Sequence, residues 1–353
     1  MDEWYDILPC LQNKQLVWYS QCSQLFYAIS SRYIQQAQWK KLGFALLAKD
    51  GDLEGVRYLV KRCGADVHTW NEWGNDGLQS ASIGDHLEVV KYLVLEKGAD
   101  VHARNSWGRD ALQTASIYGR LDVVRFLVER CGADVHARDE FGHDALRLAS
   151  THGHMEVVRY LVEVGGADVH ALDKGTLRMA GRYGRLEVVK YLVLEGGADV
   201  HALNDDALRL ASLYGHLEVV AYLVEKGADV HAEAELALLW ASCNGHMNVV
   251  RFLVEKGANA HAQNDWALRR ASAYGHVQVV RFLVDKCGAD VHAENDDALR
   301  VASESGHLNV VRYLVKNGAD VHARNDYAMQ FASAAGHFEV VCFLESKGAV
   351  IPS

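Results

Sequence analysis

One stretch decides the fold: Gly215-His216-Leu217-Glu218-Val219-Val220-Ala221-Tyr222-Leu223-Val224-Glu225-Lys226-Gly227-Ala228-Asp229-Val230-His231-Ala232. Near-copies of it recur along the chain. The Gly-Ala step begins at Gly64, Gly98, Gly132, Gly166, Gly197, Gly227, Gly257, Gly288 and Gly318, with a remnant at Gly348. The spacing is 34 residues for the first three intervals and then 30 or 31. A fixed period of this length indicates a repeat architecture.

Each period predicts a pair of helices joined by a tight turn. In the quoted copy Val219, Val220, Leu223 and Val224 recur at helical spacing, with the charged residues Glu218, Glu225 and Lys226 on either side of the run. Glycine follows each predicted helix, where a left-handed residue commonly ends a helix. Because one short helix pair cannot bury its own apolar face, we expect the pairs to stack into a solenoid with a continuous core.

A second motif precedes the helix pair: Asn105-Ser106-Trp107-Gly108-Arg109-Asp110-Ala111-Leu112-Gln113. It resembles the ankyrin family pattern of aspartate or asparagine, two residues, glycine, one residue and threonine-proline-leucine-histidine. Asp110 stands at the threonine and provides a capping side chain, and Ala111 stands at the proline. The resemblance runs from about Phe44 to Gly348 and implies an all-α ankyrin repeat solenoid of about ten helix pairs. The Gly-Ala-Asp-Val-His-Ala loop also resembles the ankyrin proteins that giant viruses of amoebae encode in many copies.

The connecting loops divide into two kinds. Full-length fingers are centred on Trp73-Gly74, Trp107-Gly108 and Phe141-Gly142, whereas from Ala171 onward each finger is three residues shorter. Such short loops can turn and cap a helix but cannot project a hairpin. The candidate caps are Asp205, Asp265, Asp296 and Asp326. We therefore expect long-finger binding only in the first half of the array.

Residues 1–43 do not repeat and form a predicted helical N-terminal module ahead of the array at 44–353. The stretches Ile7–Leu16 and Ser20–Tyr27, with the closing Trp39–Leu42, are similar to an F-box. That resemblance implies docking on a Skp-type adaptor, through a set of apolar side chains. The set is Leu8, Leu11, Leu16, Leu25 and Phe26. Alternatively, the module is a cap that covers the first repeat. A cap would pack Leu11, Leu16 and Phe26 onto Phe44 and Leu47.

The composition indicates which partners and which cellular compartment to expect. A net charge of −10 argues against broad binding to nucleic acid or to acidic lipid. The seven cysteines form no CxxC pair and indicate free thiols in a reducing compartment. No stretch is apolar for long enough to span a membrane. We expect an intracellular protein of the cytoplasm, a monomer without membrane or nucleic-acid partners.

The eighteen histidines form two ladders rather than a metal cluster. One ladder is in the loops: His68, His102, His136, His170, His201, His231, His261, His292 and His322. The other begins the longer helices: His154, His216, His246, His276, His307 and His337. Equivalent residues of neighbouring repeats lie about 10 Å apart, whereas zinc ligands lie about 2 Å from one ion. We predict turn and inter-repeat hydrogen bonding, with no metal and no cofactor.

Two further sets are candidates for partner binding. An arginine ladder on the shorter helices consists of Arg147, Arg178, Arg209, Arg269 and Arg300, interrupted by Leu239. It can grip carboxylates, although Asp144, Asp206 and Asp297 each precede an arginine by three residues, which favours internal pairing. The aromatic set is Trp73, Trp107, Phe141, Trp240, Trp266 and Tyr327. These rings are either interface anchors or folded back on their own repeats.

The expected function is protein recognition through fingers and a concave helical face, without catalysis, because no nucleophile, base and orienting group stand outside the repeat pattern. A more specific hypothesis is a substrate adaptor for a cullin-type ubiquitin ligase. The alternative is a plain binding or structural ankyrin protein with no link to ubiquitin.

Overall fold

The computed structural model describes residues 36–71 and 74–350, with side chains described from residue 43 except at 171–174. Every regular element in these ranges is a helix, as expected. The helices form ten pairs, the predicted number. By its internal contacts the chain divides into two compact units, residues Met1–Ala145 and Leu146–Ser353.

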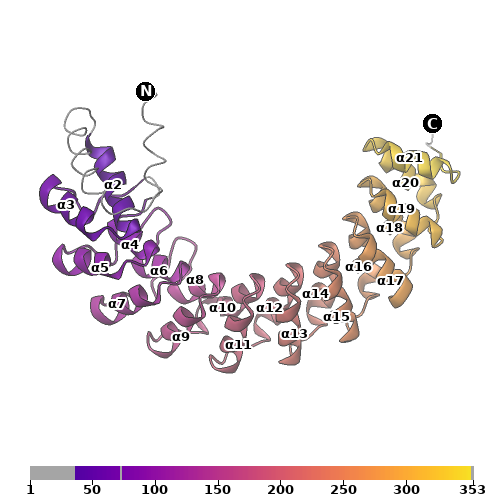
Figure 1. Cartoon of the computed structure of the whole chain (residues 1–353). Helices are drawn as coiled ribbons and strands as arrows, with labels where there is room; N and C mark the ends of the chain where they lie inside the picture. The colour runs from indigo at the N-terminus through magenta and orange to yellow at the C-terminus, as the bar shows by residue number, and fades with distance from the viewer. Residues whose placement is uncertain (1–35, 72–73, 351–353) are drawn as a thin grey trace. The chain divides into compact units, whose positions relative to one another are not determined.

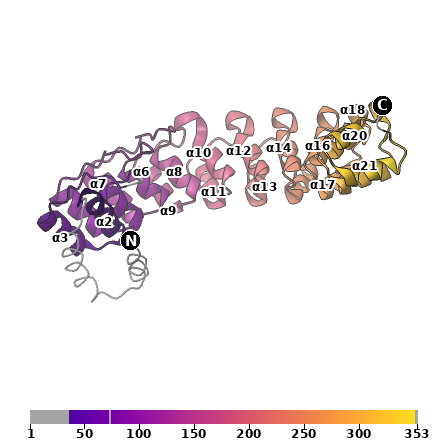
Figure 2. The same cartoon turned by 90° about the horizontal axis from the view of Figure 1, so that it is seen from above.

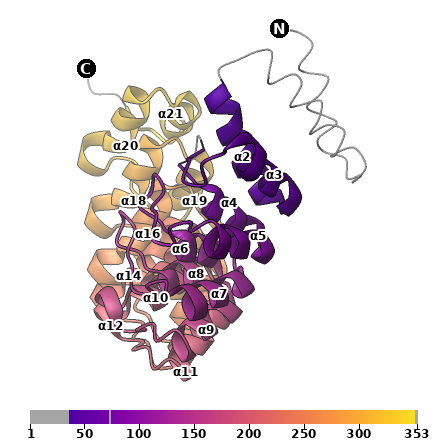
Figure 3. The same cartoon turned by 90° about the vertical axis from the view of Figure 1, so that its left-hand side faces the viewer.

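The first unit stacks three helix pairs. Their bounds are α2 Gln36–Asp50 with α3 Leu53–Cys63; α4 Gly77–Gly84 with α5 Leu87–Lys91, continued by the π-helix η2 Tyr92–Glu96; and α6 Ala111–Ile117 with α7 Leu121–Cys131. In Figure 3, α3, α5 and α7 lie beside α2, α4 and α6. The ring of Phe44 is fully buried, and a Cβ at Gly77 would stand 2.2 Å from its Cε1 atom. Glycine at residue 77 therefore allows α2 to pack closely on α4.

The second unit contains seven pairs, of which α8 starts at the last residue of the first unit. The bounds are α8 Ala145–His152, α9 Met155–Glu163, α10 Ala171–Arg182, α11 Leu186–Leu194, α12 Ala202–Leu213, α13 Leu217–Glu225, α14 Ala232–Cys243, α15 Met247–Glu255, α16 Ala262–Ala273, α17 Val277–Cys287, α18 Ala293–Glu304, α19 Leu308–Lys316, α20 Ala323–Ala334 and α21 Phe338–Glu345. We call the even-numbered members of this unit the inner helices and the odd-numbered members the outer helices. Figure 1 follows these pairs along the unit, and Figure 2 shows α12, α14 and α16 in one row with α13 and α17 in the other.

The core is one apolar seam between the two rows. In the repeat quoted above, Val219, Val220 and Leu223 of α13 and Leu208 of α12 are each no more than 1% exposed. Full burial of one such side chain contributes about 2 kcal/mol. Since every repeat supplies an equivalent set, stability accumulates from neighbour to neighbour.

Four of the six histidines that begin the outer helices connect successive repeats, as predicted. His246 places its ring Nε2 2.9 Å from the carbonyl oxygen of Leu213 in the preceding repeat. His216, His276 and His307 make equivalent bonds. A Cβ at Gly215 would stand 2.5 Å from the Nδ1 atom of His246, and Gly215 has a φ of 77°. Glycine is thus needed both for the turn and for the approach of the next histidine.

The loop histidines are part of turns, also as predicted. The backbone N–H of His231 donates to the Asp229 carboxylate at 2.8 Å, and the other members of this ladder make the same two-residue bond. In the second unit the ring adds a contact, because Nδ1 of His231 lies 2.6 Å from the carboxylate of Glu235. Equivalent pairs are His201–Asp205, His261–Asp265, His292–Asp296 and His322–Asp326.

The short loops from residue 202 onward differ from the expected caps. Leu203, Asn204 and Asp205 have φ values of 54°, 56° and 59°, so three consecutive residues are left-handed. The carboxylate of Asp205 accepts from the backbone N–H of Asp229 in the following loop at 3.0 Å. The prediction that Asp205, Asp265, Asp296 and Asp326 cap helices is therefore wrong. These side chains hold loop histidines, and Asp205, Asp296 and Asp326 also bond to the next loop.

Candidate functional site

The fingers of the first unit are held by a buried capping box at the start of each short helix. The carboxylate of Asp110 accepts from the backbone N–H of Gln113 at 2.8 Å, and the side chain of Gln113 accepts from the N–H of Asp110 at 3.0 Å. The amide nitrogen of Gln113 also donates to the carbonyls of Ala137 and His143 in the next finger. Gln79 makes the equivalent bonds one repeat earlier. Each finger is thus fixed by the helix behind it.

Burial changes the acidity of these capping carboxylates. Desolvation raises the pKa of Asp76 to about 6 against the hydrogen bonds that its carboxylate accepts, and it raises the pKa of Asp110 in the same way. Asp139 is different. Burial also pushes its pKa upward, but the N–H of His143 and the guanidinium of Arg109 outweigh that effect, so the pKa of Asp139 is lowered.

Side chains also connect the fingers to one another. The amide of Asn105 donates to the side-chain oxygen of Asn75 at 2.9 Å, and Nε of Arg109 donates to Asp139 at 3.0 Å. The tip residues are left exposed by this network. Trp107 is 40% exposed and Phe141 is 61% exposed. Trp73 lies outside the described residues.

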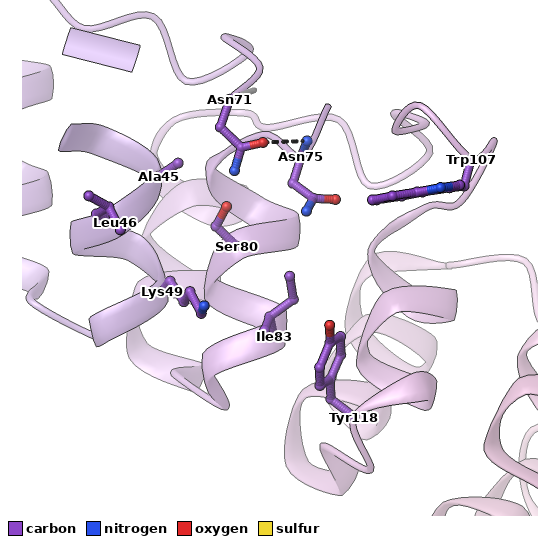
Figure 4. A pocket seen from close by; sticks show the side chains of 9 residues that line it. All are labelled: Ala45, Leu46, Lys49, Asn71, Asn75, Ser80, Ile83, Trp107 and Tyr118. Carbon is purple, nitrogen blue, oxygen red and sulfur yellow. Dashed lines mark hydrogen bonds between the residues drawn. The ribbon is translucent and has the colours of Figure 1, made fainter. Parts of the chain in front are cut away.

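A hollow of about 260 Å³ lies between the fingers and the short helices of the first unit. Its lining is Ala45, Leu46, Lys49, Asn71, Asn75, Ser80, Ile83, Trp107 and Tyr118. Figure 4 shows Trp107 extending toward Asn75, with Tyr118 near Ile83 on the helix side. Lys49 makes no ion pair with a described residue, so the hollow combines two aromatic rings with an available ammonium group. Such a site suits an apolar side chain beside a carboxylate.

The predicted arginine ladder of the second unit is largely paired within the protein, as the spacing favoured. Asp206 contacts Arg209 at 3.0 Å and also pairs with Arg178 of the preceding repeat. Asp297 contacts Arg300 and Arg269 in the same arrangement. Arg147 lies beside Gly175, which occupies the register of Asp206. Leu239 is buried and interrupts the ladder.

The predicted aromatic residues of the second unit are partly covered. The guanidinium carbon of Arg209 lies 5.7 Å from the centroid of the half-buried Trp240. Trp266 is also half-buried. Tyr327 is 39% exposed and makes an edge-to-face contact with Phe331, which is 36% exposed. Arg209 and Trp240 therefore contact each other. Of Trp240, Trp266 and Tyr327, Tyr327 has the most accessible ring.

A row of exposed tyrosines at the carboxyl ends of inner helices was not predicted. Tyr183, Tyr214 and Tyr274 are 44%, 43% and 52% exposed at equivalent positions. Arg182 lies over the rings of both Tyr183 and Tyr214, at 5.5 and 5.1 Å, and Arg270 lies 5.1 Å from that of Tyr274. The recurring Tyr-Gly dipeptide was the signal that could have revealed this row.

Other kinds of site find little support in the part of the chain that the structure describes. No three histidine, cysteine or carboxylate side chains of residues 36–71 and 74–350 gather as metal ligands would. In the same ranges no helix has both the length and the apolar composition needed to cross a membrane. The F-box-like residues Leu8, Leu11, Leu16, Leu25 and Phe26 lie outside the described residues.

Comparison with known proteins identifies the family. No curated protein sequence matches the chain. Among solved structures, the chain is similar to the ankyrin repeat domain of Bcl-3, described as a unique member of the IkappaB protein family. The two are 27% identical over 60% of this chain and 97% of that one, with a TM-score of 0.46. The family model for ankyrin repeats (3 copies) matches overlapping windows at residues 44–139, 131–204, 146–234, 177–264, 208–295, 238–325 and 268–352. Because these windows run from residue 44 to residue 352, the chain belongs to the ankyrin repeat family.

Proposed function

We propose that the protein is a recognition scaffold that binds a protein partner through the fingers of residues 1–145 and the inner helices of residues 146–353. The observation that carries this proposal is the row formed by Tyr183, Tyr214 and Tyr274, whose rings remain exposed although the inner helices pack closely. Arginine and tyrosine are the side chains that most often anchor protein interfaces. Ankyrin proteins are typically binding scaffolds rather than enzymes, and we propose the same here.

The two candidate surfaces suit different anchors. In the first unit Trp107, Phe141 and the adjoining hollow can receive an apolar side chain, with Lys49 pairing a neighbouring carboxylate. In the second unit the guanidinium of Arg182 lies against Tyr183 and Tyr214 and makes no ion pair with a carboxylate of the described residues. An aromatic-supported guanidinium binds carboxylates well. The arginines that share Asp206 and Asp297 are weaker candidates because their charge is already compensated.

The scaffold proposal is tested by selecting peptides from a random displayed library on the full chain. We expect recovered peptides that lose binding when Tyr214→Ser or Trp107→Ser is introduced. The matched control is Arg159→Gln, on the outer helix α9, which should leave binding unchanged. Failure to recover any peptide whose binding depends on Tyr214 or Trp107 contradicts the proposal.

We further propose that residues 1–43 form a separate module and that the array at 44–353 holds a target for a cullin-type ubiquitin ligase. The F-box-like stretches in residues 7–27 support this role, together with Trp39–Leu42. The helix α2, Gln36–Asp50, would then continue from the module into the first repeat. In the plain-scaffold alternative, the same residues only cap the array.

Calorimetric titration of the full chain against a Skp-type adaptor separates these alternatives. The adaptor role predicts saturable binding that Leu11→Asp with Leu16→Asp abolishes while thermal unfolding of the repeats is unchanged. Absence of binding by a folded full chain rejects the adaptor role and leaves the scaffold role standing. We also propose that the protein acts as a monomer, which sedimentation would test. The loop similarity to giant-virus ankyrin proteins supports a location in the cytoplasm of a host cell, which imaging of tagged protein would test.

A further inference from the structure

The outer helices α15, α17 and α19 carry arginines without acidic partners. Arg251, Arg281 and Arg312 occupy equivalent positions and are all exposed. On α9 the equivalent Arg159 contacts Glu163 at 3.4 Å and Glu195 at 3.3 Å. On α11, Lys190 contacts Glu187 at 2.8 Å.

Arg159 pairs with Glu163 and Glu195, and Lys286, Asn317 and Lys347 stand where Glu195 does in the repeats that follow α15, α17 and α19. The position three residues before the arginine, which holds the partner of Lys190 on α11, changes as well. The helices α9 and α11 have Glu156 and Glu187 there, whereas the three later helices have Asn248, Gln278 and Asn309. None of the three arginines makes an ion pair with a described residue. With their C-terminal capping residues, α15, α17 and α19 carry six basic and two acidic side chains, a net charge of +4. The corresponding count on α9, α11 and α13 is three basic and six acidic, a net of −3.

An apolar hollow of about 500 Å³ lies at one end of this row, between α19 and α21. Cys342 of α21 and Ser346, which follows that helix, occupy the positions of Arg312 and Lys316 of α19, so two long side chains are replaced by short ones. Leu308, Phe338 and Phe343 line the space that results, and Phe338 is 78% exposed.

The rim of the hollow is mainly basic. The guanidinium of Arg312 and the ammonium of Lys347 each lie 5.7 Å from the ring centroid of Phe343. Glu339 is the acidic member of the lining. Along the row, the carboxylate of Asp285 accepts a hydrogen bond from the hydroxyl of Tyr313 at 2.7 Å. This bond partly compensates the negative charge of Asp285.

We infer that the arginine row and the hollow together bind an extended acidic peptide segment that carries one aliphatic side chain. The aliphatic side chain fills the hollow, and carboxylates pair with Arg312, Arg281 and Arg251 in turn. Successive outer helices lie about 10 Å apart, and a peptide in the extended polyproline II conformation rises about 3.1 Å per residue with three residues per turn, so every third side chain lies on one face. A carboxylate at every third residue therefore matches the spacing of the arginines.

A peptide fits this face better than a nucleic acid does. Glu255, Asp285 and Glu339 are interspersed among the basic residues. They repel a continuous phosphate backbone, whereas a peptide can place neutral residues opposite them. The hollow also requires an aliphatic group, which a phosphate backbone lacks.

The test uses the full chain and a fluorescein-labelled peptide with one leucine followed by three glutamates at three-residue intervals. The control peptide has the same composition with its glutamates adjacent. Anisotropy should show saturable binding that is tighter for the spaced peptide and weakens with salt. A single exposed ion pair contributes about 0.2–1 kcal/mol, so Arg281→Gln should weaken binding by up to about fivefold. The triple variant Arg251→Gln, Arg281→Gln, Arg312→Gln should weaken it further, by about three- to 150-fold if the three pairs add.

Matched variants distinguish this surface from general charge attraction. Arg159→Gln should leave the affinity unchanged, since Arg159 is already paired. Replacing the peptide's leucine with serine should weaken binding to the natural chain but not to Cys342→Arg, in which the hollow is filled. Equal loss in Arg159→Gln and Arg281→Gln overturns the inference, as does equal binding of the two peptides. Tighter binding of a single-stranded oligonucleotide of equal charge would assign the face to nucleic acid and overturn the inference. A dimer that Cys342→Arg disperses would assign the face to a second copy of the chain and overturn it as well.

Discussion

The first and second units use different connectors at the same position in the repeat. In the first unit Asp110 and Gln113 form a buried capping box that holds a projecting finger. In the second, the same register carries Asp206 and Arg209, which pair with each other, and the loop is a left-handed turn held by a histidine–carboxylate contact. In the first unit, carbonyl groups of the long fingers accept hydrogen bonds from the neutral side-chain amide of Gln113. In the second unit, the start of the inner helix carries the charged pair Asp206 and Arg209 instead, and it is more open to solvent.

This difference assigns different recognition surfaces to the two units. The first unit gains exposed finger tips and a hollow beside them. The second unit has no such tips in its described loops, so its accessible aromatic rings lie at helix ends, as Tyr183, Tyr214 and Tyr274 show. The connector therefore influences both stability and the kind of surface available to a partner.

The largest expected effect on stability is that of a substitution at Gln113. Gln113→Ala leaves the N–H of Asp110 and the carbonyls of Ala137 and His143 without their partner in a buried site. Each orphaned buried group costs about 1–3 kcal/mol, so we expect a loss of about 3 kcal/mol in the free energy of unfolding. Arg209→Ala should cost less, because Arg209 is an ion-paired side chain near solvent. Urea titration measures both, and an equal loss contradicts the distinction between the connectors.

The pH dependence of the buried caps is the next largest effect. The pKa of Asp76 is raised from 3.8 to about 6, so between these values the unfolded carboxyl loses its proton first and stability falls as pH rises. Asp76→Asn lacks this dependence. Relative to that of the natural chain, the free energy of unfolding of Asp76→Asn should rise by up to about 3 kcal/mol between pH 4 and pH 7.

Asp139 provides a control of opposite sign for that measurement. Its pKa is lowered, so its contribution is present above the unfolded value and is lost as pH falls. Asp139→Asn should therefore lose stability relative to the natural chain as pH rises through the acidic range. If the unfolding free energies of Asp76→Asn and Asp139→Asn changed with pH in the same direction, the pKa values of the two carboxyls would not be shifted in opposite directions.

The left-handed turns predict a smaller effect at Ala234. This residue has a φ of 55°, a conformation that costs an L-residue about 1–2 kcal/mol. Ala234→Gly should raise the unfolding free energy by about 0.5–1 kcal/mol after the added flexibility of the unfolded chain is included. Ala103→Gly, in a loop of the first unit without positive φ, should lower it by about the same amount. Thermal unfolding that shows the same sign for both substitutions contradicts the turn geometry.

The smallest predicted effect is the titration of His231. Its hydrogen bond with Glu235 raises the pKa of His231 above 6.5. The stabilisation from this pair is therefore complete below pH 6.5 and is lost as pH rises through the folded pKa. His231→Gln should remove this dependence, which NMR titration of the ring protons checks directly. An unshifted midpoint for His231 in the folded chain excludes the pairing.

Periodicity predicted most of the fold. The glycine spacing, the valine and leucine pattern and the change in finger length correctly indicated ten helix pairs with two kinds of loop. The role of Asp205 could not be predicted, because its partner at Asp229 is brought close only by the left-handed turn. The exposed tyrosines were missed for a related reason, since their exposure depends on how neighbouring repeats pack, which the spacing alone does not give.

Hydrogen exchange of the full chain, alone and with a peptide recovered by selection, tests the assignment of separate recognition surfaces most directly. The account predicts protection in either the finger segment 104–118 or the inner-helix ends around 182–185, 213–216 and 273–276. Substitution of Trp107 should remove only the first pattern and substitution of Tyr214 only the second. Protection confined to the outer helices α9, α11 and α13, or unaffected by either substitution, would contradict it.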